Sequence, residues 1–354
     1  MTRGNRIDGS FDAVVRCSGM NNFRYILAPI VLGLAPFGAA AQTPPLGVNL
    51  ERFDYPYPVK WFESRSPGVS VRMAYLDIPP TTAANGRVAV LLHGKNFCAA
   101  TWGDTARALA ARGYRVIAPD QVVFCKSSKP DGFQYSIAGL ATLTKELLDS
   151  IGVARPILIG HSTGGLIAMR YALLYPEHVA SLVLVNPLGL NDTLAEGVPY
   201  APLGALLAEE AKTDAASIKA YQVRNYYHGT WQPRYDRWVT MLAGQYATLE
   251  GKTVRTAQAR LSEMIETQPV AADIPRITVP TTLIIGQADK TAFRASSAPA
   301  GRRDQIRTVP QAAEVAVKRF PNARLIRLAG LGHAPQIEAP DRFQETLIRA
   351  LDQP

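Results

Sequence analysis

Short unbroken hydrophobic runs alternate with amphipathic segments along most of this chain. Apolar runs bounded by turn residues are typical of strands buried on both faces of a sheet. We expect such strands at residues 88–92, 114–118, 157–159, 182–185, 281–285 and 324–328, with an edge strand at 69–78. Apolar residues at helical spacing predict helices at 101–112, 137–148, 163–175, 312–319 and 340–351. The alternation predicts the α/β class, with a mostly parallel sheet covered by helices on both faces.

Two segments depart from this alternation. Residues 42–60 are rich in proline and are expected to run over the surface in extended form. Residues 190–274 are helical in composition and rich in aromatic side chains, which suits either the core of an inserted helical subdomain or a lid above an apolar pocket. The expected organisation is therefore a core of 42–189 and 275–354 with a helical cap at 190–274. Candidates for lining the pocket are Phe97, His161, Tyr227, Trp231 and Trp238.

The composition fits a globular protein with a sizeable core. Of the 354 residues 47% are hydrophobic and 19% are charged, which is too few charges for a disordered chain. A formal net charge of +9 would suit a protein that binds nucleic acid. The densest basic stretch, residues 294–307, lacks both a recognition motif and interleaved aromatic residues. We therefore expect a small-molecule substrate and no nucleic-acid partner, and no feature of the sequence predicts an oligomeric state.

Residues 1–41 contain the three parts of a secretory signal peptide. A short region with Arg24 precedes an apolar run at 25–37 and a series of small residues that ends at Ala41. This run is too short and too interrupted by proline to span a membrane. Acidic residues upstream make Met20 an alternative start. We expect an exported protein, periplasmic or secreted, that is cleaved near Ala41 and has no stable membrane insertion afterwards.

The motif that carries chemistry follows the expected strand at 157–159. Gly160-His161-Ser162-Thr163-Gly164 matches Gly-x-Ser-x-Gly at a sharp turn from strand to helix. Such a turn leaves the serine hydroxyl exposed on a strained backbone. We interpret Ser162 as a nucleophile and His161 as a residue that packs beneath it.

A serine nucleophile requires a histidine base that is held by a carboxylate. His333 lies in a loop just after the last expected strand, which returns it to the sheet edge that carries Ser162. The carboxylate is expected between the two in sequence, and Asp289 closely follows the strand at 281–285. Asp192 is the alternative.

Backbone N–H groups must face the nucleophile to stabilise a developing oxyanion. Thr163 opens the helix after Ser162 and supplies one such group. The loop that begins at His93 supplies the second from Lys95 or Asn96, and both remain candidates. His93 is then expected to brace this loop.

No cofactor and no metal are expected from the sequence. The glycines at 160–165 do not form a Gly-x-Gly-x-x-Gly fingerprint, and no Walker-type phosphate loop is present. The spacings His-x-x-x-His and Cys-x-x-Cys, which would indicate a metal site, are also absent.

Together these motifs resemble the α/β-hydrolase superfamily, in its serine-hydrolase form with a helical cap after the sixth strand. The resemblance covers residues 70–350 and rests on His93-Gly94, Pro119-Asp120, residues 126–130, the glycine–serine turn at 160–165, Asp289 and Gly332-His333. It implies an eight-stranded sheet and the triad order Ser162, Asp289, His333. Two positions where the family usually has glycine are occupied by Val123 and Cys125, so the shape of that loop does not follow from the resemblance.

The resemblance implies hydrolysis of a carboxylic ester, or a related acyl bond, of a small and largely apolar substrate. Carbon–carbon bond hydrolases and cofactor-free perhydrolases of this fold keep the same serine triad and remain alternatives. A catalytically silent ligand-binding protein on this fold usually lacks one triad member, whereas all three are present here. Haloalkane dehalogenases and epoxide hydrolases have aspartate where Ser162 stands, which disfavours both.

The resemblance also implies a disulfide between Cys98 and Cys125. In this fold the strands before these residues are neighbours, so both loops leave the sheet side by side, and an exported protein meets an oxidising compartment. In the chain-entropy model a loop of this length stabilises the fold by about 3 to 4 kcal/mol. Thiol titration of the unreduced mature protein should find no free thiol from either residue. Two free thiols would contradict the pairing.

Overall fold

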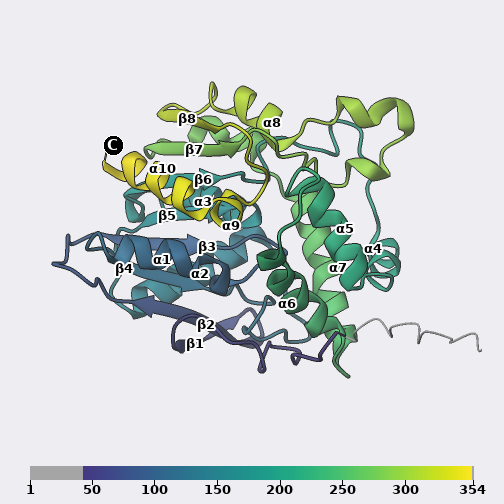
Figure 1. Cartoon of the computed structure of the whole chain (residues 1–354), viewed down its shortest axis with the longest axis horizontal. Coiled ribbons are helices and arrows are strands. Elements are labelled where there is room, and N and C mark those ends of the chain that lie inside the picture. Colours follow the sequence, from purple (N-terminus) through teal and green to yellow (C-terminus); the bar gives the residue numbers. More distant parts are fainter. Residues whose placement is uncertain (1–42, 353–354) are drawn as a thin grey trace, which may run out of the picture. The chain divides into compact units, whose positions relative to one another are not determined.

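The computed structural model describes residues 43–352, whose centre is one eight-stranded sheet. The strand order is β1-β2-β4-β3-β5-β6-β7-β8 (Figure 1). The strands are β1 (Val59–Ser66), β2 (Val69–Ile78), β3 (Val88–Leu92), β4 (Arg115–Pro119), β5 (Ile157–His161), β6 (Ser181–Val185), β7 (Thr281–Gly286) and β8 (Ala323–Leu328). β3 to β8 are parallel, whereas β1 and β2 pair in antiparallel fashion. The expected fold class is confirmed. The signal peptide expected at residues 1–41 lies outside the described residues.

One strand was not expected and changes the edge of the sheet. β1 begins at the end of the segment 42–60, which was expected to run over the surface in extended form, and it pairs along its whole length with β2. β2 therefore has partners on both sides, β1 and β4, and is not the edge strand. The alternating exposure of β1 explains this position, because one face of an edge strand packs on the protein while the other meets solvent.

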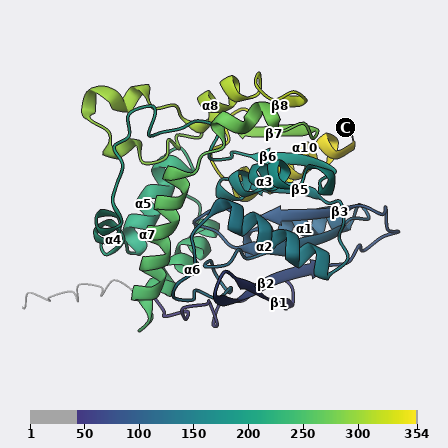
Figure 2. The same cartoon turned by 180° about the vertical axis from the view of Figure 1, so that it is seen from behind.

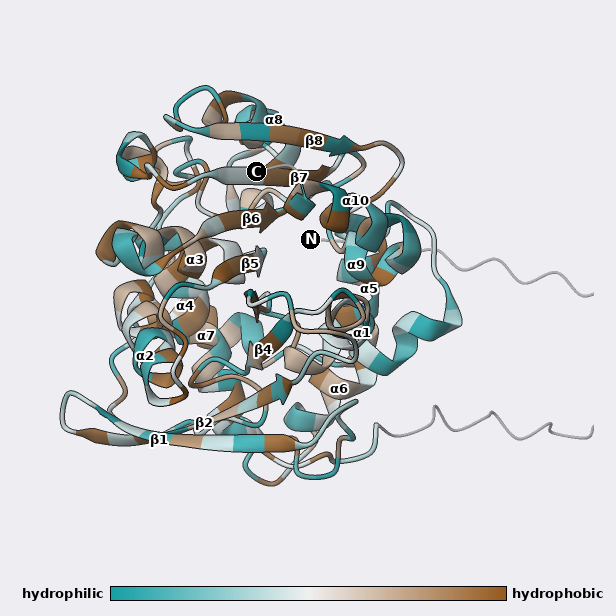
Figure 3. Cartoon of the chain, turned by 90° about the vertical axis from the view of Figure 1, so that its left-hand side faces the viewer, coloured by the Kyte–Doolittle hydropathy of each residue, from teal (hydrophilic) through white to brown (hydrophobic). Residues whose placement is uncertain are grey.

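Helices cover both faces of the sheet. The helices of the described residues are α1 (Gly103–Ala110), α2 (Ile137–Ser150), α3 (Thr163–Leu174), α4 (Leu203–Glu210), α5 (Ala215–Asn225), α6 (Asp236–Tyr246), α7 (Gly251–Thr267), α8 (Val309–Ala316), α9 (Pro335–Glu338) and α10 (Pro340–Asp352). Short 3₁₀ segments lie at Ala99–Trp102, Pro176–His178, Pro233–Tyr235, Ala271–Arg276, Ala295–Ser297 and Ala300–Gln305. In Figure 3, α2 and α3 lie on one side of the sheet, and α1 and α10 on the other. Within residues 43–352, no helix combines the length and the apolar character needed to cross a membrane.

The four helices α4 to α7, here called the cap, fall between β6 and β7, as the sequence indicates. Figures 1 and 2 show them beyond the carboxyl ends of the parallel strands. The limits of the cap as a separate domain, residues 190–274, stay a prediction.

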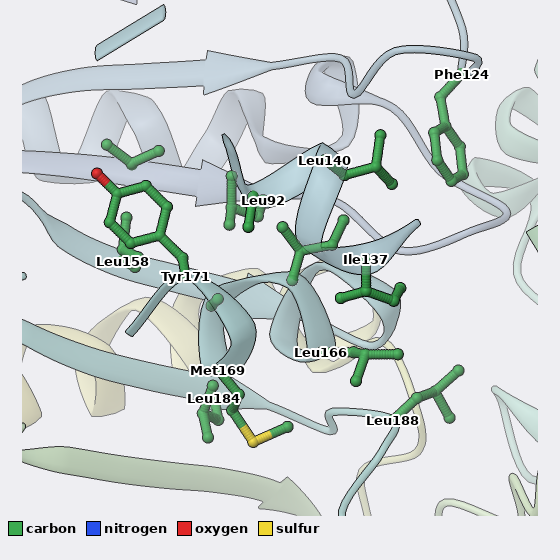
Figure 4. Packing of buried hydrophobic residues seen from close by; sticks show 14 of the residues in the cluster. Leu92, Phe124, Ile137, Leu140, Leu158, Leu166, Met169, Tyr171, Leu184 and Leu188 are labelled. Atoms are coloured by element: carbon green, nitrogen blue, oxygen red, sulfur yellow. The ribbon is translucent and has the colours of Figure 1, made fainter. Parts of the chain in front are cut away.

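Two apolar clusters hold the sheet between its helical layers. The larger one joins side chains of α2, α3 and α8 to the strands, and Figure 4 shows Leu166 and Met169 of α3 packed with Leu158 and Leu184. The second joins α1 and α10 to the opposite face, through residues such as Phe343. Burial of this apolar surface is the main force that fixes the strand ends, which carry the candidate site.

The turn between β5 and α3 brings backbone segments into unusually close contact. A Cβ atom at Gly160 would lie 2.4 Å from the carbonyl oxygen of Gly164, and one at Gly164 would lie 2.2 Å from that of Leu92. At Gly165 a Cβ would lie 2.5 Å from Cβ of Pro187. Only glycine fits at these positions, because backbone atoms cannot move away as a flexible side chain can.

Replacement of Gly164 by alanine should therefore destabilise the protein. We expect Gly164→Ala to lower the free energy of unfolding by about 3 kcal/mol, since the added methyl group forces β3 and α3 apart. Chemical denaturation monitored by circular dichroism measures the change. The matched control is Gly204→Ala in α4, where a Cβ meets no atom within 4 Å. That change should be neutral or stabilise by about 0.5 kcal/mol. Equal effects at the two sites would contradict the close-packing explanation.

Candidate active site

Ser162 sits in the strained turn that the sequence motif indicates. Its backbone has φ 54° and ψ −119°, and its side chain stands at the start of α3. The backbone N–H of Ser162 donates to the carbonyl of Val185 at 3.0 Å, and the Ser162 carbonyl accepts from Leu188 at 3.1 Å. A non-glycine residue in this region of φ and ψ persists only where its surroundings impose it. Here strand β6 and the segment after it impose the conformation.

His333 and Asp289 form a buried hydrogen-bonded pair. The distance from Nδ1 of His333 to Oδ2 of Asp289 is 2.7 Å, and the two residues are 1% and 3% exposed. The pairing fixes the ring and leaves Nε2 as the nitrogen that can exchange a proton. Asp192, the alternative carboxylate, instead accepts the backbone N–H of Ala195.

Asn186 completes the binding of the Asp289 carboxylate and was not identified from the sequence. Its Nδ2 donates to Oδ2 of Asp289 at 2.8 Å, while its own Oδ1 accepts the N–H of Gly286 at 3.0 Å. The N–H of Thr291 donates to Oδ1 of Asp289 at 2.7 Å. Hydrogen bonds of this kind compensate for the burial of a carboxylate. A polar residue directly after the buried run 182–185 is the signal that would have pointed to Asn186.

Two other histidines brace the site. His161 is buried, and its Nε2 lies 2.8 Å from the carbonyl oxygen of His333, to which it donates in its neutral form. Burial, and then the neighbouring His333, hold the pKa of His161 well below its usual value. His93 accepts the N–H of Gln121 at Nε2 and lies 2.9 Å from the carbonyl of Gly94 at Nδ1. Burial also lowers the pKa of His93. Both rings are therefore neutral supports.

Tyr226 connects the cap to two parts of the site. Its ring stacks on the imidazole of His333, with ring centres 4.5 Å apart and an angle of 27° between the planes. Its carbonyl accepts the backbone N–H of His333 at 2.9 Å. Its hydroxyl accepts from Nδ2 of Asn96 at 2.9 Å. No periodicity or motif marked Tyr226 among the aromatic residues of the cap.

The loop that was expected to supply an oxyanion donor packs directly against Ser162. A Cβ atom at Gly94 would lie 2.9 Å from Cβ of Ser162. Lys95 and Asn96 line the same cavity as Ser162, and both remain candidates for the second donor. Thr163 is the first residue of α3, so its N–H lacks an acceptor within the helix.

A cavity of about 730 Å³ opens between the cap and the strand ends. Both Ser162 and His333 line it, together with residues of α4, α5 and α6. A cavity of this size accommodates a small-molecule substrate. Its aromatic walls are Tyr221, Tyr226, Tyr246 and Phe293.

The five residues proposed from the sequence to line the pocket lie elsewhere. Phe97 is 1% exposed and packs against Tyr226 and His161. Tyr227 stacks on Tyr235 at 3.9 Å and contacts Trp231, and Trp238 packs against Phe53. None of the five is among the residues that line the cavity. These aromatic residues form apolar packing within the cap and between cap and core, the first of the two roles open to them from the sequence.

The two cysteines lie on adjacent loops beside the site. Their Cα atoms are 5.9 Å apart, within the reach of a disulfide. Asp120 links the same loops, because it accepts the N–H groups of Ala99 at 2.8 Å and Lys126 at 3.0 Å. Val123 has φ 70° and Cys125 has φ 46°. The loop thus keeps positive φ where the family usually has glycine.

Comparison with known proteins agrees with this fold. The family model for the alpha/beta hydrolase fold matches residues 89–340. Lipase 1 of Psychrobacter immobilis is 29% identical over 267 residues, which are 73% of this chain and 76% of that protein. A 2-hydroxy-6-oxo-6-phenylhexa-2,4-dienoate hydrolase of Burkholderia cepacia is 31% identical over 140 residues, 39% of this chain and 49% of that protein. A probable hydrolytic enzyme from Pseudomonas aeruginosa PAO1 has a solved structure with a TM-score of 0.85 and 48% identity, covering 87% of this chain and 99% of its own.

Loss of the Asn186 amide should destabilise the protein. Asn186→Ala leaves a buried carboxylate with one donor fewer and places alanine at φ 41°, so we expect the free energy of unfolding to fall by about 3 kcal/mol. Asn186→Gly removes the amide without backbone strain and should still cost about 2 kcal/mol. Urea denaturation measures both values. The exposed Asn322→Ala serves as control and should change stability by less than about 0.5 kcal/mol. If Asn186→Gly unfolds with the same free energy as wild type, the amide contributes nothing to stability.

Proposed function

This chain belongs to the α/β-hydrolase family, and we propose that it is a serine hydrolase that cleaves a carboxylic ester through an acyl-enzyme on Ser162. The observation that carries the proposal is the 2.7 Å pair of His333 and Asp289 at a cavity that Ser162 also lines. Acyl transfer requires a nucleophile on a strained turn, a histidine with one nitrogen held by a carboxylate, and backbone donors beside the nucleophile.

In the proposed mechanism Oγ of Ser162 attacks the ester carbonyl while Nε2 of His333 takes the hydroxyl proton. Asp289 stabilises the imidazolium that forms. The N–H of Thr163 and one from Lys95 or Asn96 bind the oxyanion of the tetrahedral intermediate. Collapse of the intermediate breaks the bond to the alkoxy group, which leaves as an alcohol with the proton from His333. Water then attacks the acyl-enzyme with His333 as base and releases the carboxylic acid.

Carbon–carbon bond hydrolysis is the second candidate. The similarity to the dienoate hydrolase of Burkholderia cepacia supports it, although that match spans about half of the relative's length. The same serine, histidine and aspartate serve both reactions. Turnover of simple esters compared with turnover of a vinylogous 1,5-diketone distinguishes them, because a carbon–carbon hydrolase acts on the diketone at the higher rate.

Export and a Cys98–Cys125 bridge belong to the same proposal. The leader-like composition of residues 1–41 supports export. The 5.9 Å separation of the two Cα atoms supports the bridge, which would hold the loop of the second oxyanion donor next to the loop that follows β4.

Ser162→Ala tests the proposed reaction. We expect wild-type protein to hydrolyse 4-nitrophenyl butyrate and the variant to lose at least about a thousandfold in kcat, because no acyl-enzyme can form. A fluorophosphonate should label Ser162 of the wild-type protein, located by peptide mass spectrometry. The control is Ser70→Ala, at an exposed position of β2, which should keep both turnover and labelling. A folded wild-type protein without turnover or labelling would favour the ligand-binding alternative.

Tyr226 should matter to the rate through the orientation of His333. Tyr226→Leu removes the stacked ring, and we expect kcat for the ester to fall by about tenfold with little change in KM. Tyr226→Phe keeps the ring and the backbone acceptor, so its kcat should stay within about threefold of wild type. The control is Tyr200→Leu, an exposed cap tyrosine. If Tyr226→Leu raises KM and leaves kcat unchanged, the ring contacts substrate and does not position the histidine.

A further inference from the structure

The walls of the cavity are more polar than the sequence led us to expect. A largely apolar substrate was expected, and Leu188, Ile218, Leu242 and Phe293 do provide apolar surface. Most of the other lining residues carry hydroxyl, amide or charged groups. The charged residues other than His333 are Lys95, Glu209, Glu210, Arg224, Lys290 and Arg294.

Four of these charged residues are already paired with one another. Lys95 and Glu210 form an ion pair at 3.2 Å, and Arg294 contacts Glu209 at 2.7 Å. Arg294 also lies 3.4 Å from the buried carboxylate of Glu266. The acidic groups of the cavity wall are therefore neutralised by lysine and arginine within the same wall.

Arg224 and Lys290 are the remaining cations of the wall. Both are exposed, and neither side chain forms an ion pair or hydrogen bond with any residue in the described range 43–352. The cavity thus has an excess of positive charge. Field lines concentrate in a cavity with low-dielectric walls, so such an excess attracts anions.

The fold brings these two cations to the same margin of the cavity. Arg224 is next to Asn225 at the end of α5, and the carbonyl of Asn225 accepts the backbone N–H of Lys290 at 3.3 Å. Lys290 follows Asp289 directly in the chain. The backbone of the two cations therefore meets where the end of α5 contacts the loop that carries Asp289.

Tyr221 lies one turn before Asn225, on the same helix as Arg224. Burial, and then the charge of Asp289, raise the pKa of Tyr221 to about 12, although Arg224 acts in the opposite direction. Tyr221 lines the cavity and its ring contacts Tyr226, which stacks on His333.

We propose that Arg224 and Lys290 form an anion-binding subsite, and that the natural ester carries a carboxylate on the portion that extends toward the end of α5. The inference rests on the proposed ester hydrolysis at Ser162. Arginine offers paired N–H donors that match a carboxylate, and lysine adds a second charged donor. The substrate class is therefore a half-ester of a dicarboxylic acid, or an ester whose alcohol bears a carboxylate.

Two matched pairs of esters test the proposal on the acyl and alcohol sides. The acyl pair is 4-nitrophenyl butyrate and mono-4-nitrophenyl succinate, in which a carboxylate replaces a methyl group. The alcohol pair is phenyl butyrate and 4-carboxyphenyl butyrate. We expect the wild-type kcat/KM to favour the anionic ester in one pair. The double variant Arg224→Gln/Lys290→Gln should lower that anionic-to-neutral ratio by about tenfold. Added NaCl should lower the ratio in wild type only, because screening acts on the charged pair.

The control is Lys252→Gln, an exposed lysine of α7 that does not line the cavity, which should leave the ratio as in wild type. A ratio that the double variant does not change would overturn the subsite.

Binding of succinate to the Ser162→Ala variant, measured by calorimetry, tests the subsite without turnover. Its Kd should rise about tenfold when Arg224 and Lys290 are both replaced. Absence of succinate binding would overturn the subsite, whereas absence of turnover of the neutral esters would overturn the proposed function alone.

Discussion

The close contact of backbone segments at the turn between β5 and α3 is the constraint on which the site depends. Gly164 lets the turn lie against the end of β3, and Gly160 lets the turn fold closely onto its own backbone at Gly164, at distances that exclude any side chain. β5 pairs with β3 on one side and β6 on the other, so neither end of the turn can relax. The unfavourable φ of Ser162 is imposed by this packing. The position of Ser162 is thus a property of the sheet and its glycines.

The loop after β4 is also held in an unfavourable backbone conformation by its surroundings, here without glycine. Positive φ costs a β-branched or bulky residue on the order of 1–2 kcal/mol, yet Val123 and Cys125 both adopt it. Asp120 accepts N–H groups from both loops at the site, and the hydroxyl of Ser127 donates to the carbonyl of Asp120 at 2.7 Å. Lys129, whose ammonium group donates to the carbonyl of Cys125 at 2.7 Å, adds a further contact. Hydrogen bonds and packing hold the shape that glycine usually permits.

The elements that sequence patterns predict well are those buried on both faces. Short apolar runs such as 157–159 and 281–285 are typical of strands buried on both faces. The serine motif between strand and helix likewise indicates a sharp turn with the serine at its tip. β1 was missed because it is an edge strand whose polar positions outnumber its apolar ones. The pocket residues were misplaced for a different reason. A large aromatic side chain such as Tyr227 stabilises a small helical cap as readily as it lines a cavity, and only the packing decides. Asn186 and Tyr226 act through contacts between segments that are distant in the sequence, and such contacts leave no periodic signal.

The contacts of Tyr226 have a consequence for the way such proteins diversify. The cap residue supplies a backbone acceptor to His333 and covers its ring, while its hydroxyl receives the amide of Asn96. A cap transplanted from a related protein would therefore exchange part of the support of the base together with the walls of the cavity. Recombination at the ends of β6 and β7 would keep these contacts to His333 only if the new cap brings an equivalent of residue 226. The cap is thus not an interchangeable specificity module, and changes of substrate range are best reached by single substitutions within it.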